Sequence, residues 1–178
     1  MDFHYYTAAT LNGFLADEAD SLQWLFDVPG AAETEKGAGQ FLAGISTLVM
    51  GSHTYEWLLR EMDLLDNPGA WPYGGQKTFV FSSRDLPVPE GVDIEVVNGP
   101  VQSVIPEMTG EVWIIGGGDL AGQFLDAGAL TTITLTLAPA FLATGKPLLP
   151  RNLFSDRLEL TGATKKGQFV ELAFDVTG

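Results

Sequence analysis

Three consecutive glycines, Gly116, Gly117 and Gly118, follow an apolar strand predicted over residues 112–115 and precede a helix predicted over residues 119–127. Glycine lets a ligand approach the main chain closely, and the first turn of a helix offers unpaired N–H groups at the positive end of its dipole. One glycine pair at such a junction is typical of a tight turn, but three glycines exceed what a turn requires. The pattern therefore predicts a site for a phosphate or pyrophosphate group.

The same segment fits the dinucleotide-binding pattern G-x-G-x-x-A through Gly116, Gly118 and Ala121. The Rossmann form of that pattern requires an acidic residue about 20 positions later, at the end of the next strand. No Asp or Glu occurs between Asp126 and Asp156, and the strands predicted in that region are antiparallel. These features exclude a Rossmann fold.

Two other predicted strands also end in polar, helix-starting sequence. Gly51, Ser52, His53 and Thr54 follow a strand at 46–50, and Ser82, Ser83 and Arg84 follow a strand at 78–81. Taken alone, the first group is typical of ordinary helix capping and the second of a polar strand end. Parallel strands present their carboxyl ends on the same side of a sheet. The three groups are therefore expected to form one rim.

The elements that must position this rim alternate between strand and helix for two thirds of the chain. This order predicts a mostly parallel sheet with helices on its faces, and a strand-rich end predicts antiparallel strands at one edge. We expect α/β architecture in a single domain over residues 1–178. The predicted strands are 3–10, 46–50, 78–81, 94–97, 112–115, 133–137, 158–161 and 169–174, and the predicted helices are 33–42, 52–62, 119–127 and a weak one at 101–108.

The composition limits the partners. Nine Lys and Arg against 23 Asp and Glu give a net charge of −14, which argues against nucleic acid as a partner. The chain has no cysteine, and its two histidines have 48 residues between them, so no metal site is expected. Any anion must be bound by local devices such as backbone N–H groups, against an unfavourable overall field.

No membrane segment or signal peptide is predicted. The amino-terminal residues lack a basic region followed by an apolar one. The longest uncharged stretch, residues 127–145, contains glycines and a proline and alternates with a period of two at its centre, as strands do. We expect a cytoplasmic protein without a membrane partner.

The ordered motifs resemble the dihydrofolate reductase superfamily. They are residues 7–16, residues 49–54, Phe81–Arg84, residues 114–128, Leu137-Ala138-Pro139 and Gly145–Leu148, in this order across almost the whole chain. The closer resemblance is to the branch built like the carboxyl-terminal reductase domain of the bifunctional riboflavin-biosynthesis deaminase/reductase. The resemblance implies that fold, a nicotinamide cofactor (usually NADPH, with NADH not excluded) and a homodimer.

The resemblance also assigns cofactor-binding residues. It implies that Ala9 and Thr10 border the nicotinamide. It also implies that Gly116, Gly117 and Gly118 (the glycine rim) hold the pyrophosphate, with a cis peptide between Gly116 and Gly117. The remaining implied positions are Gly51, Ser52, His53 and Thr54 at the second helix start, Ser82, Ser83 and Arg84 at the adenosine ribose, and Gly118, Asp119 and Leu120 at the first helix start. The family commonly has Arg where Ser52 stands, which weakens the expected preference for NADPH over NADH.

The substrate side is less defined. Asn12, Trp24 and Asp27 are the candidate substrate contacts, with Asn12 and Gly13 expected to begin a mobile loop. No side chain is identified as a catalytic acid, and proton delivery from water is therefore left open.

The expected function is that of an NAD(P)H-dependent reductase that transfers hydride to a small heterocyclic or carbonyl-type substrate. The alternative from another class is a non-catalytic nucleotide-binding module of the same fold. A true dihydrofolate reductase is disfavoured, because Lys77 is the only cation between Glu61 and Ser83, where a folate carboxylate clamp would be needed.

Overall fold

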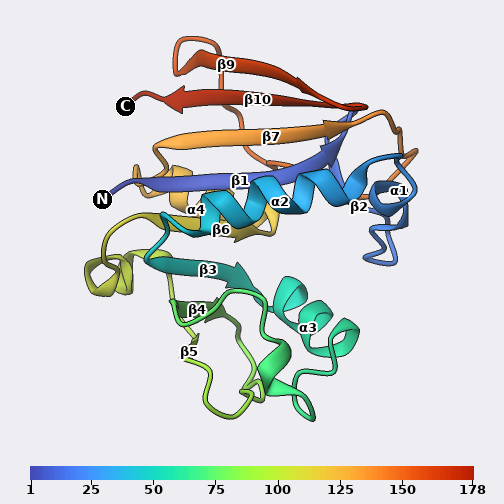
Figure 1. Cartoon of the computed structure of the whole chain (residues 1–178). Helices are drawn as coiled ribbons and strands as arrows, with labels where there is room; N and C mark the ends of the chain where they lie inside the picture. The colour runs from blue at the N-terminus through green and yellow to red at the C-terminus, as the bar shows by residue number, and fades with distance from the viewer.

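A single eight-stranded sheet extends through the chain from Phe3 to Val176, in a computed structural model that describes all 178 residues. Figure 1 shows the strand order β5-β4-β3-β6-β1-β7-β10-β9, from the bottom of the view to the top. The six strands from β5 to β7 are parallel, and β10 pairs antiparallel with both β7 and β9. The strands are β1 (Phe3–Thr10), β3 (Thr47–Gly51), β4 (Lys77–Phe81), β5 (Ile94–Val97), β6 (Val112–Gly116), β7 (Thr132–Ala138), β9 (Leu158–Lys166) and β10 (Phe169–Val176).

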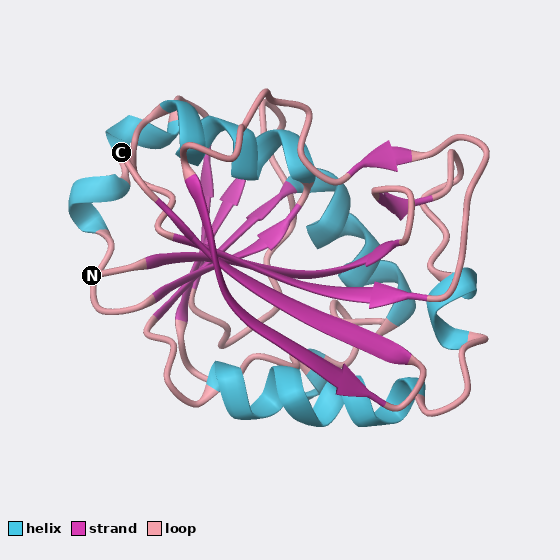
Figure 2. Cartoon of the chain, turned by 90° about the horizontal axis from the view of Figure 1, so that it is seen from above, coloured by secondary structure: helices cyan, strands magenta, loops and turns pink.

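Helices cover both faces of the sheet, as Figure 2 shows on either side of the twisted fan of strands. Helix α3 (Ser52–Glu61) packs Tyr55 and Leu58 against Met50 of β3, while α4 (Gly118–Asp126) packs Phe124 against the opposite face at Val49. Helix α2 (Ala31–Leu42) lies on the same face as α3, over Trp113 and Leu48. Central strands are thus covered on both faces, which explains their continuous apolar runs.

The carboxyl-terminal strands form a hairpin at one edge. Strands β9 and β10 turn at Gly167, whose φ of +60° lies in the left-handed region that glycine adopts readily. Most of β9 is exposed or half-buried because it is the last strand of the sheet. The predicted strand at 158–161 is confirmed and extends further than its local pattern indicated.

The prediction of a helix at 101–108 is wrong. The structure has two 3₁₀ turns there, η2 (Val101–Ser103) and η3 (Ile105–Glu107). A third, η1 (Pro68–Ala70), lies between α3 and β4. Pro106 has no N–H and cannot continue the α-helical ladder, so the segment remains in short turns. Its apolar residues Val101 and Val104 are nevertheless buried beneath the sheet.

Three short elements were not predicted. Helix α1 (Gln23–Phe26) has four residues, and β2 (Phe14–Ala16) pairs antiparallel with β8 (Lys146–Pro147) in a separate two-stranded sheet. These segments are too short to show a period. Their pairing matters because it brings residues 145–148 next to the loop that follows β1.

No helix of the protein is both long enough and apolar enough to cross a membrane.

Candidate functional site

The helices that follow β3 and β6 begin side by side. The two strands are neighbours, with Met50 paired to Gly116, and they end in Gly51 and Gly116. A Cβ atom built on Gly51 would lie 3.7 Å from the backbone nitrogen of Gly117. The N-cap residues of α3 and α4, Gly51 and Gly117, make no side-chain cap hydrogen bond. Two sets of unpaired N–H groups therefore face one place at the rim of the sheet.

Gly117 leaves open space at this rim. A Cβ atom built on Gly117 would meet no protein atom within 4 Å, whereas one on Gly118 would collide with the carbonyl oxygen of Pro147. Gly118 is therefore required for packing of the helix start against β8. The peptide bond between Gly116 and Gly117 is cis.

A cavity of about 730 Å³ opens from these helix starts along the sheet. Beyond the rim it is lined mainly by aromatic and apolar side chains. Helix α2 contributes Thr34, Glu35 and Ala38, and α3 contributes Trp57 and Leu58. The aromatic lining residues are Tyr6, Trp24, Trp57, Tyr73, Phe81 and Trp113. A cavity with one polar, N–H-rich end and one aromatic end suits a ligand that has an anionic part and a flat-ring part.

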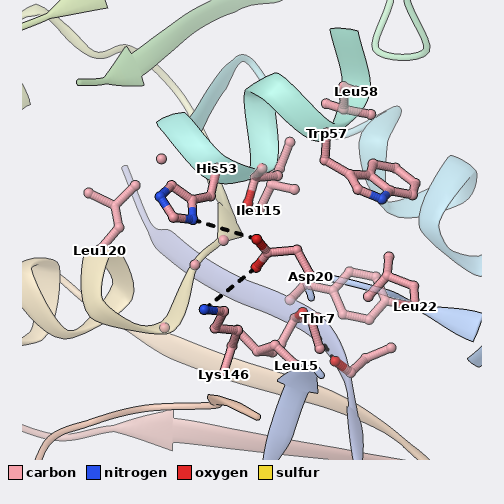
Figure 3. Close-up of a pocket in the computed structure, with 18 of the residues that line it drawn as sticks. Thr7, Leu15, Asp20, Leu22, His53, Trp57, Leu58, Ile115, Leu120 and Lys146 are labelled. Atoms are coloured by element: carbon pink, nitrogen blue, oxygen red, sulfur yellow. Dashed lines mark hydrogen bonds and ion pairs between the residues drawn. The ribbon is translucent and has the colours of Figure 1, made fainter. Parts of the chain in front are cut away.

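Three charged or titratable groups meet across the cavity. Figure 3 shows the carboxylate of Asp20 between the ring of His53 and the ammonium group of Lys146. The distances are 3.9 Å from Asp20 Oδ2 to His53 Nδ1 and 4.0 Å from Asp20 Oδ1 to Lys146 Nζ. The three residues come from the loop after β2, from the first turn of α3 and from β8, respectively.

Tyr6 of β1 lines the aromatic part of the cavity. Tyr6 Oη donates a hydrogen bond of 3.1 Å to Glu171, and Glu171 also pairs with Lys166 at 2.7 Å. Burial of the phenol and the adjacent Glu171 carboxylate raise the pKa of Tyr6 to about 12. Tyr6 therefore stays protonated at neutral pH.

Comparison with known proteins identifies the fold. No family model matches the chain. The chain is 28% identical over 172 residues to YwjB of Bacillus subtilis strain 168, which is described as uncharacterized, and the match covers 95% of this chain and 94% of YwjB. A crystal structure from Shewanella sp. PV-4, assigned by name to riboflavin biosynthesis, superposes over the whole of both chains with a TM-score of 0.82 at 24% identity.

Two enzymes of known type have the same architecture. Dihydrofolate reductase from Enterococcus faecalis, solved with NADP(H), has a TM-score of 0.67 at 15% identity over 99% of this chain and 97% of that one. A deaminase/reductase from Thermotoga maritima, which by name reduces 5-amino-6-(5-phosphoribosylamino)uracil, has a TM-score of 0.70 at 13% identity. That match covers 99% of this chain and 56% of the longer one. The chain has the dihydrofolate-reductase-like fold. The fold predicted from the sequence motifs is confirmed.

The fold brings most of the predicted cofactor residues into the cavity wall. The residues that line it are Gly51, Ser52, His53, Thr54, Gly116, Gly117, Gly118, Asp119 and Leu120, together with the predicted substrate contact Trp24. The cofactor residues come from the carboxyl ends of β3 and β6 and from the starts of α3 and α4, whereas Trp24 belongs to α1. Their roles toward a ligand stay predictions.

Other predicted residues lie outside the cavity lining. Ala9 and Thr10 are fully buried, and the Thr10 hydroxyl donates to Asn12 Oδ1 at 2.8 Å. The amide of Asn12 also donates to the carbonyl of Leu142 at 2.6 Å, so it ties two loops together. Asp27 is exposed and accepts a hydrogen bond from Gln23 on α1. The positions of Asn12 and Asp27 give no support to their predicted contact with substrate.

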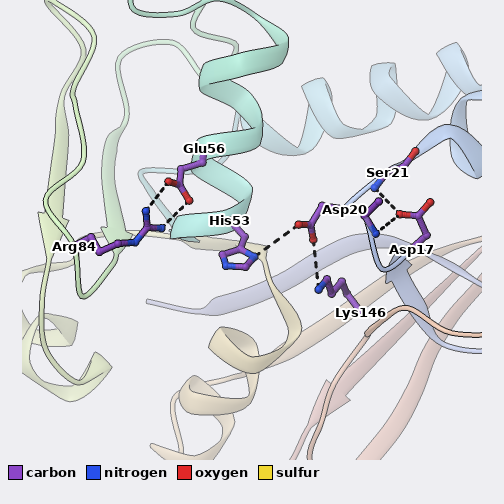
Figure 4. Close-up of polar contacts among 8 residues, drawn as sticks. Asp17, Asp20, Ser21, His53, Glu56, Arg84 and Lys146 are labelled. Carbon is purple, nitrogen blue, oxygen red and sulfur yellow. Dashed lines mark hydrogen bonds and ion pairs between the residues drawn. The ribbon is translucent and has the colours of Figure 1, made fainter.

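The third polar strand end also lies beside the cavity rather than in its wall. Ser82 is buried and accepts a hydrogen bond of 3.0 Å from the backbone N–H of Arg84, while Ser83 and Arg84 are exposed. The Arg84 guanidinium makes two hydrogen bonds to the carboxylate of Glu56 on α3, at 3.0 and 2.9 Å (Figure 4). These bonds hold the pKa of Glu56 below its usual range. Arg84 is thus already paired.

The structure adds residues that sequence reasoning missed. Asp20, Glu35, Trp57 and Lys146 all line the cavity. No motif selects Glu35, and the helical spacing of Thr34, Glu35 and Ala38 is the signal that would have selected it. Asp20 and Lys146 carry no local signal, because the pairing of β2 with β8 brings them together.

Proposed function

We propose that the protein is an NAD(P)H-dependent reductase acting on a small substrate with a flat ring or a carbonyl group. One observation carries the proposal: the open starts of α3 and α4 share a continuous cavity with an aromatic pocket. The likeness in fold to proteins whose names describe them as reductases supports the same conclusion. The fold alone does not specify a function, so the proposal depends on the site.

The residues present fit a dinucleotide. Backbone N–H groups of Gly117, Gly118 and the first turn of α3 would hold the diphosphate, and the open space at Gly117 would admit it. The hydroxyls of Ser52 and Thr54 line the same wall. When bound, a reduced nicotinamide supplies hydride, and the protein contributes orientation and exclusion of water.

NADPH is the proposed cofactor, and no strong discrimination against NADH is expected. Ser52 provides no guanidinium for a 2′-phosphate, and Arg84 is held by Glu56. An extra phosphate on the ribose must therefore compete with a carboxylate for Arg84. We expect both nucleotides to bind.

The aromatic part of the cavity is the proposed substrate site. Trp57, Trp24 and Trp113 offer ring faces for a flat substrate, and the exposed carboxylate of Glu35 lies at the same wall. The Tyr6 ring lines the same end of the cavity, while its hydroxyl donates its hydrogen bond to Glu171. These groups can orient a heterocycle while protons are exchanged with water at the exposed side.

Two measurements test the proposal. Thermal shift assays with NADPH and NADH measure cofactor binding, and a panel of heterocyclic and carbonyl compounds is then screened for substrate-dependent oxidation of the reduced nucleotide. Binding of either nucleotide together with turnover of a panel member is the expected result. The absence of a shift with both nucleotides would refute the reductase proposal. Binding without turnover across the panel would favour a nucleotide-binding module instead.

A further inference from the structure

A carboxylate of the protein itself sits between the two nitrogen-bearing side chains that reach into the cavity. Asp20 lies 3.9 Å from His53 Nδ1 and 4.0 Å from Lys146 Nζ, and Figure 4 shows it between them. Both distances exceed those of hydrogen bonds, so the contacts are coulombic and involve no fixed geometry. Such contacts can be exchanged for another anion at small cost.

The two partners of Asp20 are held by regular structure. His53 belongs to the first turn of α3, and Lys146 pairs with Ala16 in the β2–β8 ladder. The residue after Lys146 packs its carbonyl directly against Gly118, at the start of α4. The His53 and Lys146 backbones are therefore fixed relative to both helix starts.

Asp20 itself lies in a loop and has an unusual backbone. Its φ of +60° is in the left-handed region, which few residues other than glycine adopt. The loop is shaped by Asp17, whose Oδ1 accepts hydrogen bonds of 2.9 Å from the N–H groups of Ala19 and Ser21. The loop thus turns Asp20 towards the cavity, although no hydrogen bond holds its carboxylate there.

The charges of the cavity wall make this arrangement significant. Lys146 is the only lysine or arginine that lines the cavity, against three carboxylates from Asp20, Glu35 and Asp119. Asp119 is paired with Arg151 at 3.1 Å. Asp20 is therefore the carboxylate that neutralises Lys146 inside the cavity.

We propose that Lys146 completes, beside His53 of the helix start already assigned to the cofactor, an anion subsite for the diphosphate of a nucleotide, and that Asp20 is an internal competitor displaced from both side chains by that ligand. The inference rests on the proposed function for the identity of the nucleotide. The diphosphate is the group expected here because the open N–H groups of α3 and α4 face the same part of the cavity. When the diphosphate replaces the Asp20 carboxylate, His53 and Lys146 both keep an anionic partner.

The effect of Asp20 on affinity follows from the exposure of the groups. Asp20 and Lys146 are each 40% exposed and His53 is 74% exposed, so each contact has the modest strength of a surface ion pair. We expect Asp20→Asn to bind NADPH about 3- to 10-fold more tightly than wild type. Asparagine tolerates the left-handed backbone, so the loop keeps its shape.

The test measures dissociation constants of NADPH and of inorganic diphosphate at low and high salt. The variants are Asp20→Asn, Lys146→Gln, Lys146→Arg and the control Glu18→Gln, which removes a charge from an exposed position of the same loop. Lys146→Gln is expected to weaken both ligands about 3- to 10-fold, and Lys146→Arg to restore most of the affinity. The gain from Asp20→Asn should shrink as salt screens the charges.

The outcomes separate this inference from the proposed function. Equal affinities for Asp20→Asn, Glu18→Gln and wild type would overturn the competition, and an unchanged affinity in Lys146→Gln would overturn the subsite. Binding of diphosphate that depends on Asp20, without binding of NADPH, would support the subsite and reject the proposed cofactor. If neither ligand binds wild type or Asp20→Asn, the subsite is refuted.

Discussion

Replacement of Gly117 by alanine should strongly weaken nucleotide binding without harming the fold. The added methyl group would enter the open space at the rim, where no protein atom lies within 4 Å. The backbone of Gly117 has φ −87° and ψ −171°, a conformation that alanine adopts without strain. The stability of the ligand-free protein should therefore stay equal or rise by about 0.4–1 kcal/mol, because alanine has a smaller unfolded-state entropy.

The expected loss of affinity follows from the contacts that the methyl group would block. A hydrogen bond between a backbone N–H group and a charged phosphate contributes about 1.5–3 kcal/mol. Loss of one such bond weakens binding about 10- to 150-fold. NADPH at 100 times the wild-type dissociation constant adds about 2.7 kcal/mol of stability, or about 5–11 °C in Tm for a chain of this size. A variant with 100-fold weaker binding gains only about 0.4 kcal/mol at the same concentration.

Gly118→Ala provides the contrast. Its methyl group would collide with the carbonyl oxygen of Pro147, which lies in β8. Overpacking of this kind costs about 1–3 kcal/mol, so the ligand-free Tm should fall by about 2–12 °C. Differential scanning fluorimetry with and without NADPH measures both variants. If Gly117→Ala retains the wild-type shift with NADPH, the glycine rim does not hold the nucleotide.

Two further predictions concern the side chains around the rim. Glu56→Gln releases Arg84 for a 2′-phosphate, so the ratio of NADPH affinity to NADH affinity, measured by titration, should rise about 3- to 10-fold. An unchanged ratio would exclude Arg84 from nucleotide selection. Since Arg84 depresses the pKa of Glu56, this pair stabilises the fold above the ordinary glutamate pKa and loses that effect as pH falls through the lower folded value; the Tm difference between variant and wild type should therefore vanish in acid. Tyr5→Phe removes the 2.8 Å hydrogen bond from Tyr5 Oη to the Leu148 carbonyl and should cost about 1 kcal/mol, or about 2–4 °C in Tm; an unchanged Tm would show that this bond does not hold the 146–148 segment.

The glycine rim was predictable because its signals are local. A buried strand, a glycine and a helix start occur within a few residues at Gly51 and again at Gly116, and parallel pairing places both ends on one side. Nothing in that inference depends on distant partners. The mostly parallel sheet and its antiparallel edge followed from the same kind of pattern, whereas the order of the strands within the sheet was not predicted.

The remaining parts of the site depend on partners that the sequence pattern does not reveal. Arg84 looked free at a strand end, but Glu56 lies opposite it across two elements. Asn12 looked like the start of a mobile loop, but its amide is bonded to a loop 130 residues away. Lys146 is positioned by the pairing of β8 with β2. These strands have two and three residues, respectively, which is too short for a hydrophobic period to be detected. Side-chain roles at a site are thus harder to predict than the backbone that forms it.

The distribution of charge explains how so acidic a chain can bind an anion. Each cation near the rim already has a carboxylate partner: Arg84 has Glu56, Arg151 has Asp119 and Lys146 has Asp20. A phosphate that relied on these side chains would have to displace a carboxylate each time. The N–H groups at the starts of α3 and α4 have no carboxylate competitor within the N-cap residues, since both caps are glycine. The main-chain N–H groups therefore bind the phosphate without first displacing a carboxylate. The paired side chains modulate the affinity and the choice between NADPH and NADH.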